Sequence, residues 1–263
     1  MTGFSSQLRI KEGRNDAKWA DTMFHYIKKF SVFSLTDNQS IELMTAKDEE
    51  AGVVILDGMC DIVLEGKEHK NLGTRKSVFE GIPTAVYIPA GTNLKVTGTE
   101  VTFALCVGKC SQKTHSAIIR PEDIKVMQAG KDNWHREVRM IIGPDSPAQN
   151  LLIGETLNPP GNWSGTPPHK HEHNNLPGES LHEELYYFKT DKPQGYGIEK
   201  FYSPEHNIDM LIPIKDGTVT YMPYGYHQIV AAPGYTLYYL FFLSGEGKKL
   251  VGMPDKDHAW ITK

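Results

Sequence analysis

The chain has 263 residues, and 28 Lys and Arg stand against 32 Asp and Glu, which gives a formal net charge of −4. Without a basic excess it has no means of neutralising phosphates, and this argues against nucleic acid as a partner. Hydrophobic residues make up 39% of the chain, enough to fill one or two cores, which excludes disorder as the main state.

No segment of the sequence predicts a membrane span or a secretory leader. The most apolar stretch, residues 235–243, is about half as long as a span must be. The N-terminal segment lacks the apolar core of a signal peptide. The three cysteines form no CxxC pair, which is typical of reduced, buried thiols. We therefore expect a cytoplasmic protein with no membrane partner.

Helical periodicity is scarce along the chain. Residues 16–30 are the best candidate helix, although their apolar side chains follow helical spacing only in part. Further on, Asp57-Gly58 between two apolar runs predicts a hairpin, because glycine tolerates the positive φ of tight turns. Four more short apolar runs follow in the second half, at 184–188, 210–214, 218–222 and 235–243. Many short strands at near-regular spacing are typical of a β-sandwich or β-barrel.

The two halves of the chain repeat one motif. Residues 86–93 (VYIPAGTN) and residues 220–227 (TYMPYGYH) each precede an apolar strand, and their prolines lie 134 positions apart, about half of the chain. Such an offset predicts two copies of one β-barrel unit. We place these copies at residues 1–117 and 118–263.

Histidines give the clearest functional pattern. His169 and His171 are two apart, so that on a strand both imidazoles point to one face, as a shared metal ion requires. A carboxylate follows, and strand alternation lets only one of Glu183 and Glu184 face a barrel interior. His227 adds a third imidazole after a tight turn. Three neutral imidazoles and one carboxylate suit a divalent transition metal. Two further histidines of this region are expected at the surface: His173 and His182.

These spacings resemble a known superfamily. Residues 161–171 with Glu183, and residues 217–227, resemble the two motifs of the cupin superfamily. A closer resemblance extends over nearly the whole chain. The segments EELYY at 183–187 and YIPAG at 87–91 are similar to those of the bacterial 5-deoxy-glucuronate isomerase family.

The resemblance implies an all-β bicupin, that is, two tandem cupin β-barrels of the double-stranded β-helix or jelly-roll type. In the first copy Asn93 stands where the second has His227, and asparagine is a poor transition-metal ligand beside imidazole. We therefore expect the first barrel to be metal-less and structural or dimer-forming, in a homo-oligomer. The second barrel is expected to hold one divalent ion, with zinc favoured over manganese, iron or nickel.

The resemblance also implies which side chains bind this ion. They are three histidines and one glutamate: His169, His171, Glu183 and His227. We favour Glu183 over Glu184 because Leu185 and Tyr187 would then share its face and line the barrel interior.

The implied reaction is an aldose–ketose isomerisation of myo-inositol catabolism, from 5-deoxy-D-glucuronate to 5-dehydro-2-deoxy-D-gluconate. The metal would act as a Lewis acid that stabilises the enediolate. No GxGxxG follows a strand and opens a helix, so neither NAD nor flavin is expected. A hydride shift would need no protein base. Otherwise the base is one of four unassigned candidates: Glu184, Tyr187, Tyr226 and Tyr239.

The carboxylate of this small acidic sugar needs a cation. Lys170 lies between two of the expected ligands and is the first candidate, although strand alternation points it away from them. Three arginines follow it as candidates: Arg75, Arg136 and Arg139.

Other functions fit the same ligand set. A metal-dependent cupin oxygenase also uses three histidines and a glutamate, and a related uronate isomerase shares the fold and the metal site. A sugar-binding or storage bicupin would show no turnover, but the intact ligands of the second copy argue against storage. Oxygen consumption distinguishes the oxygenase, and metal content followed by turnover distinguishes the storage protein.

Overall fold

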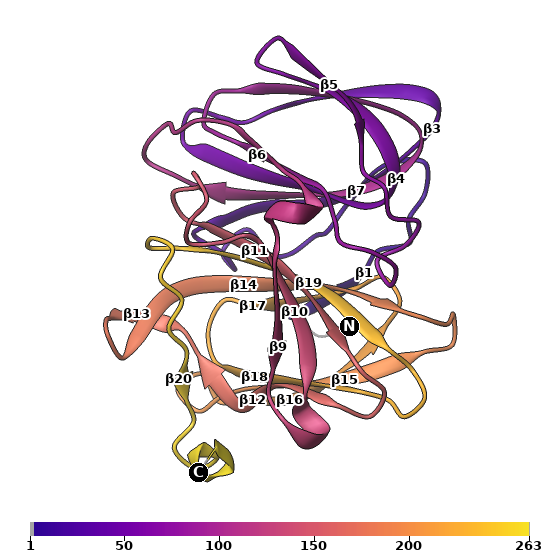
Figure 1. Ribbon diagram of the computed structural model, residues 1–263. Coiled ribbons are helices and arrows are strands. Elements are labelled where there is room, and N and C mark those ends of the chain that lie inside the picture. Colours follow the sequence, from indigo (N-terminus) through magenta and orange to yellow (C-terminus); the bar gives the residue numbers. More distant parts are fainter. Residues whose placement is uncertain (1–2, 263) are drawn as a thin grey trace.

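The computed structural model describes residues 3–262, which are built almost wholly from β-strands and connecting loops (Figure 1). This confirms the predicted all-β fold class. Across these residues the only helical segments are 3-10 turns: η1 (Pro121–Asp123), η2 (Asp132–Trp134) and η3 (Ala259–Thr262). No helix within residues 3–262 has the length and hydropathy to cross a membrane.

A seven-stranded sheet forms the N-terminal half of the described chain, in the order β2-β3-β7-β4-β6-β8, with β5 paired to β4. Its strands are β2 (Gly13–Asp16), β3 (Ile27–Met44), β4 (Glu49–Leu64), β5 (Lys67–Leu72), β6 (Ala85–Ile88), β7 (Asn93–Lys109) and β8 (Ala117–Ile119). The three long strands β3, β4 and β7 pair antiparallel over most of their length. They enclose an apolar interior that includes Phe33, Val53 and Phe103.

Two sequence-based predictions in this half are wrong. Residues 17–26 form no helix, because Trp19, Met23 and Phe24 pack against the core between the two halves instead of lining one helical face. Asp57-Gly58 is not a hairpin turn. Strand β4 continues through it as a bulge opposite β7, with Gly58 at φ +80°. A Cβ atom at Gly58 would lie 2.0 Å from the carbonyl oxygen of Glu100, so only glycine fits there.

The C-terminal half is a sandwich of two sheets. The larger has the order β1-β17-β14-β19-β11-β10-β9 with β13 paired to β14, and the smaller has the order β16-β15-β18-β12-β20. The strands of the larger sheet are β1 (Ser5–Gln7), β9 (Lys125–Ala129), β10 (Arg136–Ile142), β11 (Leu151–Asn158), β13 (Glu172–Asn175), β14 (Glu179–Thr190), β17 (Thr218–Met222) and β19 (Leu237–Gly245). Those of the smaller sheet are β12 (Trp163–Lys170), β15 (Tyr196–Ser203), β16 (Ile208–Lys215), β18 (Tyr226–Ala231) and β20 (Met253–Pro254).

Both faces of the larger sheet are covered. On β19, Tyr239 and Phe241 point into the sandwich, where they meet Phe201 and other residues of the smaller sheet. The alternate residues Leu240 and Phe242 point the other way and pack against the N-terminal half. The molecule is therefore layered, with the large sheet of the C-terminal half in the middle.

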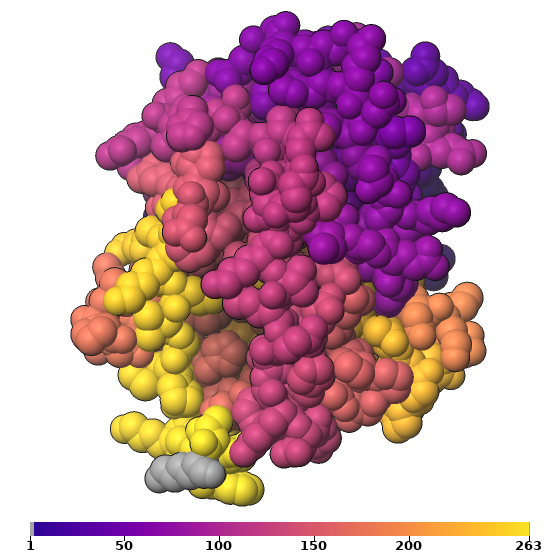
Figure 2. All heavy atoms as spheres, in the orientation of Figure 1, coloured from indigo at the N-terminus to yellow at the C-terminus, as the bar shows by residue number. Residues whose placement is uncertain are grey.

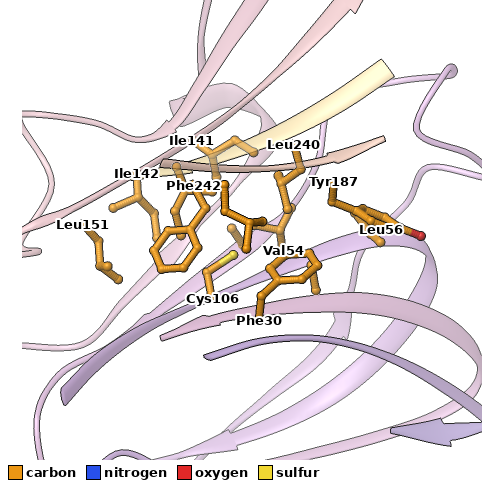
Figure 3. Packing of buried hydrophobic residues seen from close by; sticks show 14 of the residues in the cluster. Phe30, Val54, Leu56, Cys106, Ile141, Ile142, Leu151, Tyr187, Leu240 and Phe242 are labelled. Carbon is orange, nitrogen blue, oxygen red and sulfur yellow. The ribbon is translucent and has the colours of Figure 1, made fainter. Parts of the chain in front are cut away.

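One continuous apolar core joins the two halves (Figure 3). Phe30, Val54 and Cys106 of the N-terminal sheet lie against Leu240 and Phe242 of β19. All of these side chains are essentially excluded from water. Each large apolar side chain buried in this way contributes on the order of 1.5–3 kcal/mol. The three cysteines are free and buried, as predicted.

The division at residue 117 stays a prediction. Strand β8 begins at that residue and pairs with β6 of the N-terminal sheet. Strand β1, which belongs to the first predicted unit, pairs with β17 of the C-terminal half. A cut at residue 117 would thus separate strands that are hydrogen-bonded to each other.

Candidate metal centre

Three imidazoles converge inside the C-terminal sandwich. β12 and β18 pair antiparallel with His169 directly opposite His227, and His171 follows the end of β12. The ring centroids of His169 and His227 are 4.9 Å apart, and those of His171 and His227 are 5.3 Å apart. One nitrogen from each of the three rings lies within 4.8 Å of the others. Side chains from two distant stretches of chain thus meet at one point.

Glu184 completes the cluster from the facing sheet. Its Oε2 atom lies 3.0 Å from Nε2 of His171 and 3.2 Å from Nε2 of His227. Nε2 of His227 is buried and has no hydrogen-bond partner in the described chain. A buried ring nitrogen without a partner, beside a carboxylate and two further imidazoles, is the donor arrangement that a divalent transition metal requires.

Backbone carbonyls orient two of these rings. Nδ1 of His171 donates to the carbonyl oxygen of His182 at 2.7 Å. Nδ1 of His227 lies 3.4 Å from the carbonyl oxygen of Gly225. These contacts leave Nε2 as the ring nitrogen that points into the cluster and would bind the metal, which is the usual outer-shell support of a metal-binding histidine.

The protonation states also suit a metal. Burial, with His227 and His171 nearby, lowers the pKa of His169 to about 3, so this imidazole is neutral at pH 7. Burial alone would raise the pKa of Glu184, but the hydrogen bond from His171 and the charges of His171 and His227 hold it well below its usual range. Burial lowers the pKa of His171, but the carboxylate of Glu184 outweighs this and raises it overall. The centre therefore contains an ionised carboxylate and at least one neutral imidazole.

The prediction that Glu183 is the fourth ligand is wrong. Its carboxylate points to the opposite face of β14 and accepts hydrogen bonds from the backbone amides of His25, Tyr26 and Ile27, the last two at 2.7 and 2.8 Å. Leu185, on the same face, packs in the core between the halves and not in the sandwich interior. The strand is shifted by one residue from the predicted facing, which exchanges its two sides.

Lys170 does not face the imidazoles. Its ammonium group pairs with Glu172 and lies 5.6 Å from the ring centroid of Tyr226. Strand alternation places both Lys170 and Tyr226 on the other side of their strands from His169 and His227. The prediction that Lys170 binds substrate inside this cavity is therefore wrong, and Tyr226 is not a lining residue.

A cavity of about 160 Å³ opens beside His169, Glu184 and His227. Of the remaining base candidates, Tyr187 lies in the core between the halves, whereas Tyr239 lines the cavity. Tyr186, Ser164 and Arg136 are among the other residues that line the cavity. Tyr186 could have been found from the sequence with the correct facing of β14, since it alternates with Glu184.

Residues 10–261 match the family model described as KduI/IolB. The chain belongs to the KduI/IolB family. A relative named 5-deoxy-glucuronate isomerase from Geobacillus thermodenitrificans is 35% identical over 236 residues, covering 89% of this chain and 86% of its own. Another of that name from Bacillus licheniformis is 34% identical, covering 98% and 99%.

Solved structures support the same fold. An iolb-like protein from Salmonella typhimurium superposes with a TM-score of 0.93 at 27% identity, covering 99% of both chains. The oxalate decarboxylase of Lactobacillus farciminis, in its formate complex, superposes with a TM-score of 0.69 at 12% identity, covering 100% of this chain and 90% of its own. The second likeness shows the fold alone.

Two polar residues of this KduI/IolB chain, His182 and Glu199, are buried although the sequence did not predict their burial. His182, expected at the surface, is buried, with Nδ1 3.1 Å from the hydroxyl of Ser180 and Nε2 3.0 Å from the carbonyl oxygen of Gly247. His173 is exposed, in agreement with the sequence-based expectation. Glu199 on β15 is fully buried, and burial raises its pKa to about 8. No local sequence pattern distinguishes this glutamate.

The C-terminal segment closes one side of the cavity. Leu250 lines it, and β20 pairs with the end of β12 that carries His169. Figure 2 shows this yellow segment and the magenta β9–β10 hairpin on one face of the KduI/IolB chain, with the surface hollowed between them. A Cβ atom at Gly252 would lie 2.6 Å from Cδ2 of His169, so the absent side chain leaves room for the ring.

We expect Gly252→Ala to weaken metal binding by roughly 10–100-fold, the range for disturbed support of a metal ligand. The added methyl group must displace the imidazole of His169 from its partners. Metal competition against a chromogenic chelator measures the change. Gly178→Ala is the matched control, because a Cβ there meets its nearest atom at 3.5 Å, an ordinary contact. Equal affinities in both variants would contradict the role of Gly252.

Proposed function

We propose that the chain is a 5-deoxy-glucuronate isomerase, which converts 5-deoxy-D-glucuronate to 5-dehydro-2-deoxy-D-gluconate in inositol catabolism. Membership of the KduI/IolB family and the names of its relatives support this activity. The observation that carries the mechanism is the convergence of three imidazoles and Glu184 on one cavity.

The residues that would hold the metal are His169, His171, Glu184 and His227. When bound, a divalent ion supplies Lewis-acid chemistry toward the carbonyl and the neighbouring hydroxyl oxygen of the substrate. Zinc is our favoured ion, ahead of manganese, iron and nickel. Within residues 3–262 both groups that could hold a metal lie in the C-terminal half. Two of the three residues in the second group, Glu172, His173 and Glu205, are exposed, so we propose one ion per chain, at the buried histidines.

The two tyrosines that line the cavity would act as proton donors. Burial raises the pKa of Tyr186 well above its usual value, and it raises that of Tyr239 as well. Both phenols therefore keep their protons at neutral pH and can donate hydrogen bonds to substrate oxygens. Tyr239 contacts the hydroxyl of Ser164, which fixes its position. A proton-abstracting base stays unassigned, and a hydride shift is the alternative route.

The reaction class is tested with the zinc-loaded protein. We expect turnover of 5-deoxy-D-glucuronate in the absence of oxygen and without NAD or flavin, because the isomerisation moves hydrogen within the substrate. Product formation is followed by proton NMR in D₂O, and deuterium at the former aldehyde carbon indicates the enediolate route. Turnover without deuterium indicates either the hydride shift or a base that returns its own proton without exchange with solvent. An iron-loaded protein that consumes oxygen, with the zinc form inactive, would favour a cupin oxygenase instead.

Two further properties are part of this proposal. A homo-oligomer follows from the prediction that the metal-less N-terminal half serves subunit contacts, and size-exclusion chromatography with light scattering tests it. A cytoplasmic location fits a reaction on a small acidic metabolite.

A further inference from the structure

The cavity contains a cation that no carboxylate within residues 3–262 neutralises. Arg136 is the first residue of β10 and lines the cavity with Val138, two positions further along the strand. Arg139 points to the other face of β10, where it is bonded to Glu155 and Glu137. Strand alternation thus separates an arginine that faces the cavity from one that stabilises the fold.

The hydrogen bonds of Arg136 are incomplete. Its guanidinium forms no ion pair with any residue from 3 to 262, in contrast to those of Arg75 and Arg139, which both bind Glu155. Nε of Arg136 is buried and has no partner in that range. Nη1 donates a hydrogen bond to the carbonyl oxygen of Trp134 at 3.3 Å. Since buried polar groups in folded proteins are nearly always hydrogen-bonded, the free donor indicates a partner that comes from outside the chain.

The β9–β10 turn packs directly against this guanidinium. Gly130 in the turn has φ +80°, and a Cβ atom there would lie 2.2 Å from the carbonyl oxygen of Trp134 and 2.8 Å from Nη1 of Arg136. On the cavity side, the positive charge of Arg136 acts on Tyr239 and lowers the pKa that burial raises. The cation and the tyrosine therefore face the same space as His169 and His227.

We propose that Arg136 binds the carboxylate of the sugar acid and selects acidic over neutral aldoses. This inference rests on the proposed isomerase function. A planar guanidinium can bind a carboxylate through two parallel hydrogen bonds, which fixes orientation as well as adding charge attraction. With the carboxylate at Arg136, the aldehyde end of an extended sugar acid lies toward the three imidazoles. Lys170 cannot take this role inside the cavity, because it faces away and is paired with Glu172.

The kinetic test compares two substrates. One is 5-deoxy-D-glucuronate, and the other is the matching 5-deoxy aldose with a hydroxymethyl group in place of the carboxylate. We expect Arg136→Gln to lose about 100-fold or more in kcat/KM for the acid, while the value for the neutral sugar changes less than about threefold. Arg136→Lys should recover part of the loss through charge alone. Lys131→Gln, an exposed residue of the same hairpin, is the matched control.

Equilibrium binding provides a readout that does not depend on turnover. Calorimetric titration of the metal-loaded protein with D-glucuronate should give binding to wild type and Lys131→Gln but much weaker binding to Arg136→Gln, with metal content equal in all three. An equal kinetic loss on both substrates, unchanged D-glucuronate binding in Arg136→Gln, or the same loss caused by Lys170→Gln would each overturn the proposal. If the wild-type protein binds D-glucuronate through Arg136 but isomerises neither substrate, the isomerase function would be refuted, and the role of Arg136 in binding a carboxylate would stand.

Discussion

Glu184→Gln is expected to release the metal and abolish turnover, whereas Glu183→Gln keeps the metal. Glu184 lies 3.0 Å from His171 and 3.2 Å from His227, and the neutral amide removes the one negative charge of this cluster. Loss of even an outer-shell partner weakens metal binding by roughly 10–100-fold, so removing the carboxylate itself should cost at least that much. Elemental analysis after desalting, with kcat/KM on the same samples, measures both effects.

Glu183→Gln serves as the matched control at the neighbouring position. Its carboxylate accepts three backbone N–H groups from residues 25–27, so the amide should lower the free energy of unfolding by about 1–3 kcal/mol and leave metal content unchanged. If Glu183→Gln loses the metal and Glu184→Gln keeps it, the assignment of Glu184 to the face of β14 that points into the sandwich would be wrong.

Glu155→Gln is expected to destabilise the protein by about 3–5 kcal/mol, the usual cost of breaking a buried ion pair by removing one partner. Arg75 of the N-terminal half and Arg139 of β10 both donate to the carboxylate of Glu155 at 2.8 Å, and Tyr238 donates to it at 2.9 Å. The side chains of Glu155 and Arg75 are 0% and 1% exposed. Removing the charge leaves two guanidinium groups between the halves without their shared counterion.

Urea denaturation followed by circular dichroism measures the loss. The control is Glu137→Gln, because Glu137 contacts Arg139 from a side chain that is 30% exposed, and such a partly exposed pair contributes about 0–1 kcal/mol. If the two variants were equally stable, the buried cluster would not hold the halves together. Metal content should be unchanged in both, because neither residue lines the cavity.

The sequence predicted the fold class and the three imidazoles because both are encoded locally. The repeated PxG segments and the short apolar runs follow strand periodicity, and His169, His171 and His227 are placed by alternation and by one tight turn. The prediction of Glu183 instead of Glu184 as the ligand was wrong for a physical reason. Both faces of β14 are buried, one in the sandwich and one against the N-terminal half, so the sequence pattern does not identify the face that points inward.

Arg136 was ranked behind Lys170 as the candidate cation for a different reason. Lys170 lies next to the ligands in sequence, but alternation turns it away from them. Arg136 is more than thirty residues from the first imidazole, and it reaches the cavity only because β10 lies beside β11 in the large sheet. Side chains brought together by sheet order carry no local sequence signal. The same holds for residues 17–26, whose aromatic side chains are held by a distant core.

Strand β1 has a consequence for the order in which the chain can fold during synthesis. Ser5 pairs with Thr220, which the ribosome adds 215 positions later in the chain. Until then residues 5–7 have no strand to pair with. Strand β17 is in turn one edge of the large sheet until β1 covers it, and an uncovered edge is open to pairing with other chains. The β1–β17 ladder therefore closes only late in translation, and removing residues 5–7 would leave β17 as the uncovered edge of the large sheet.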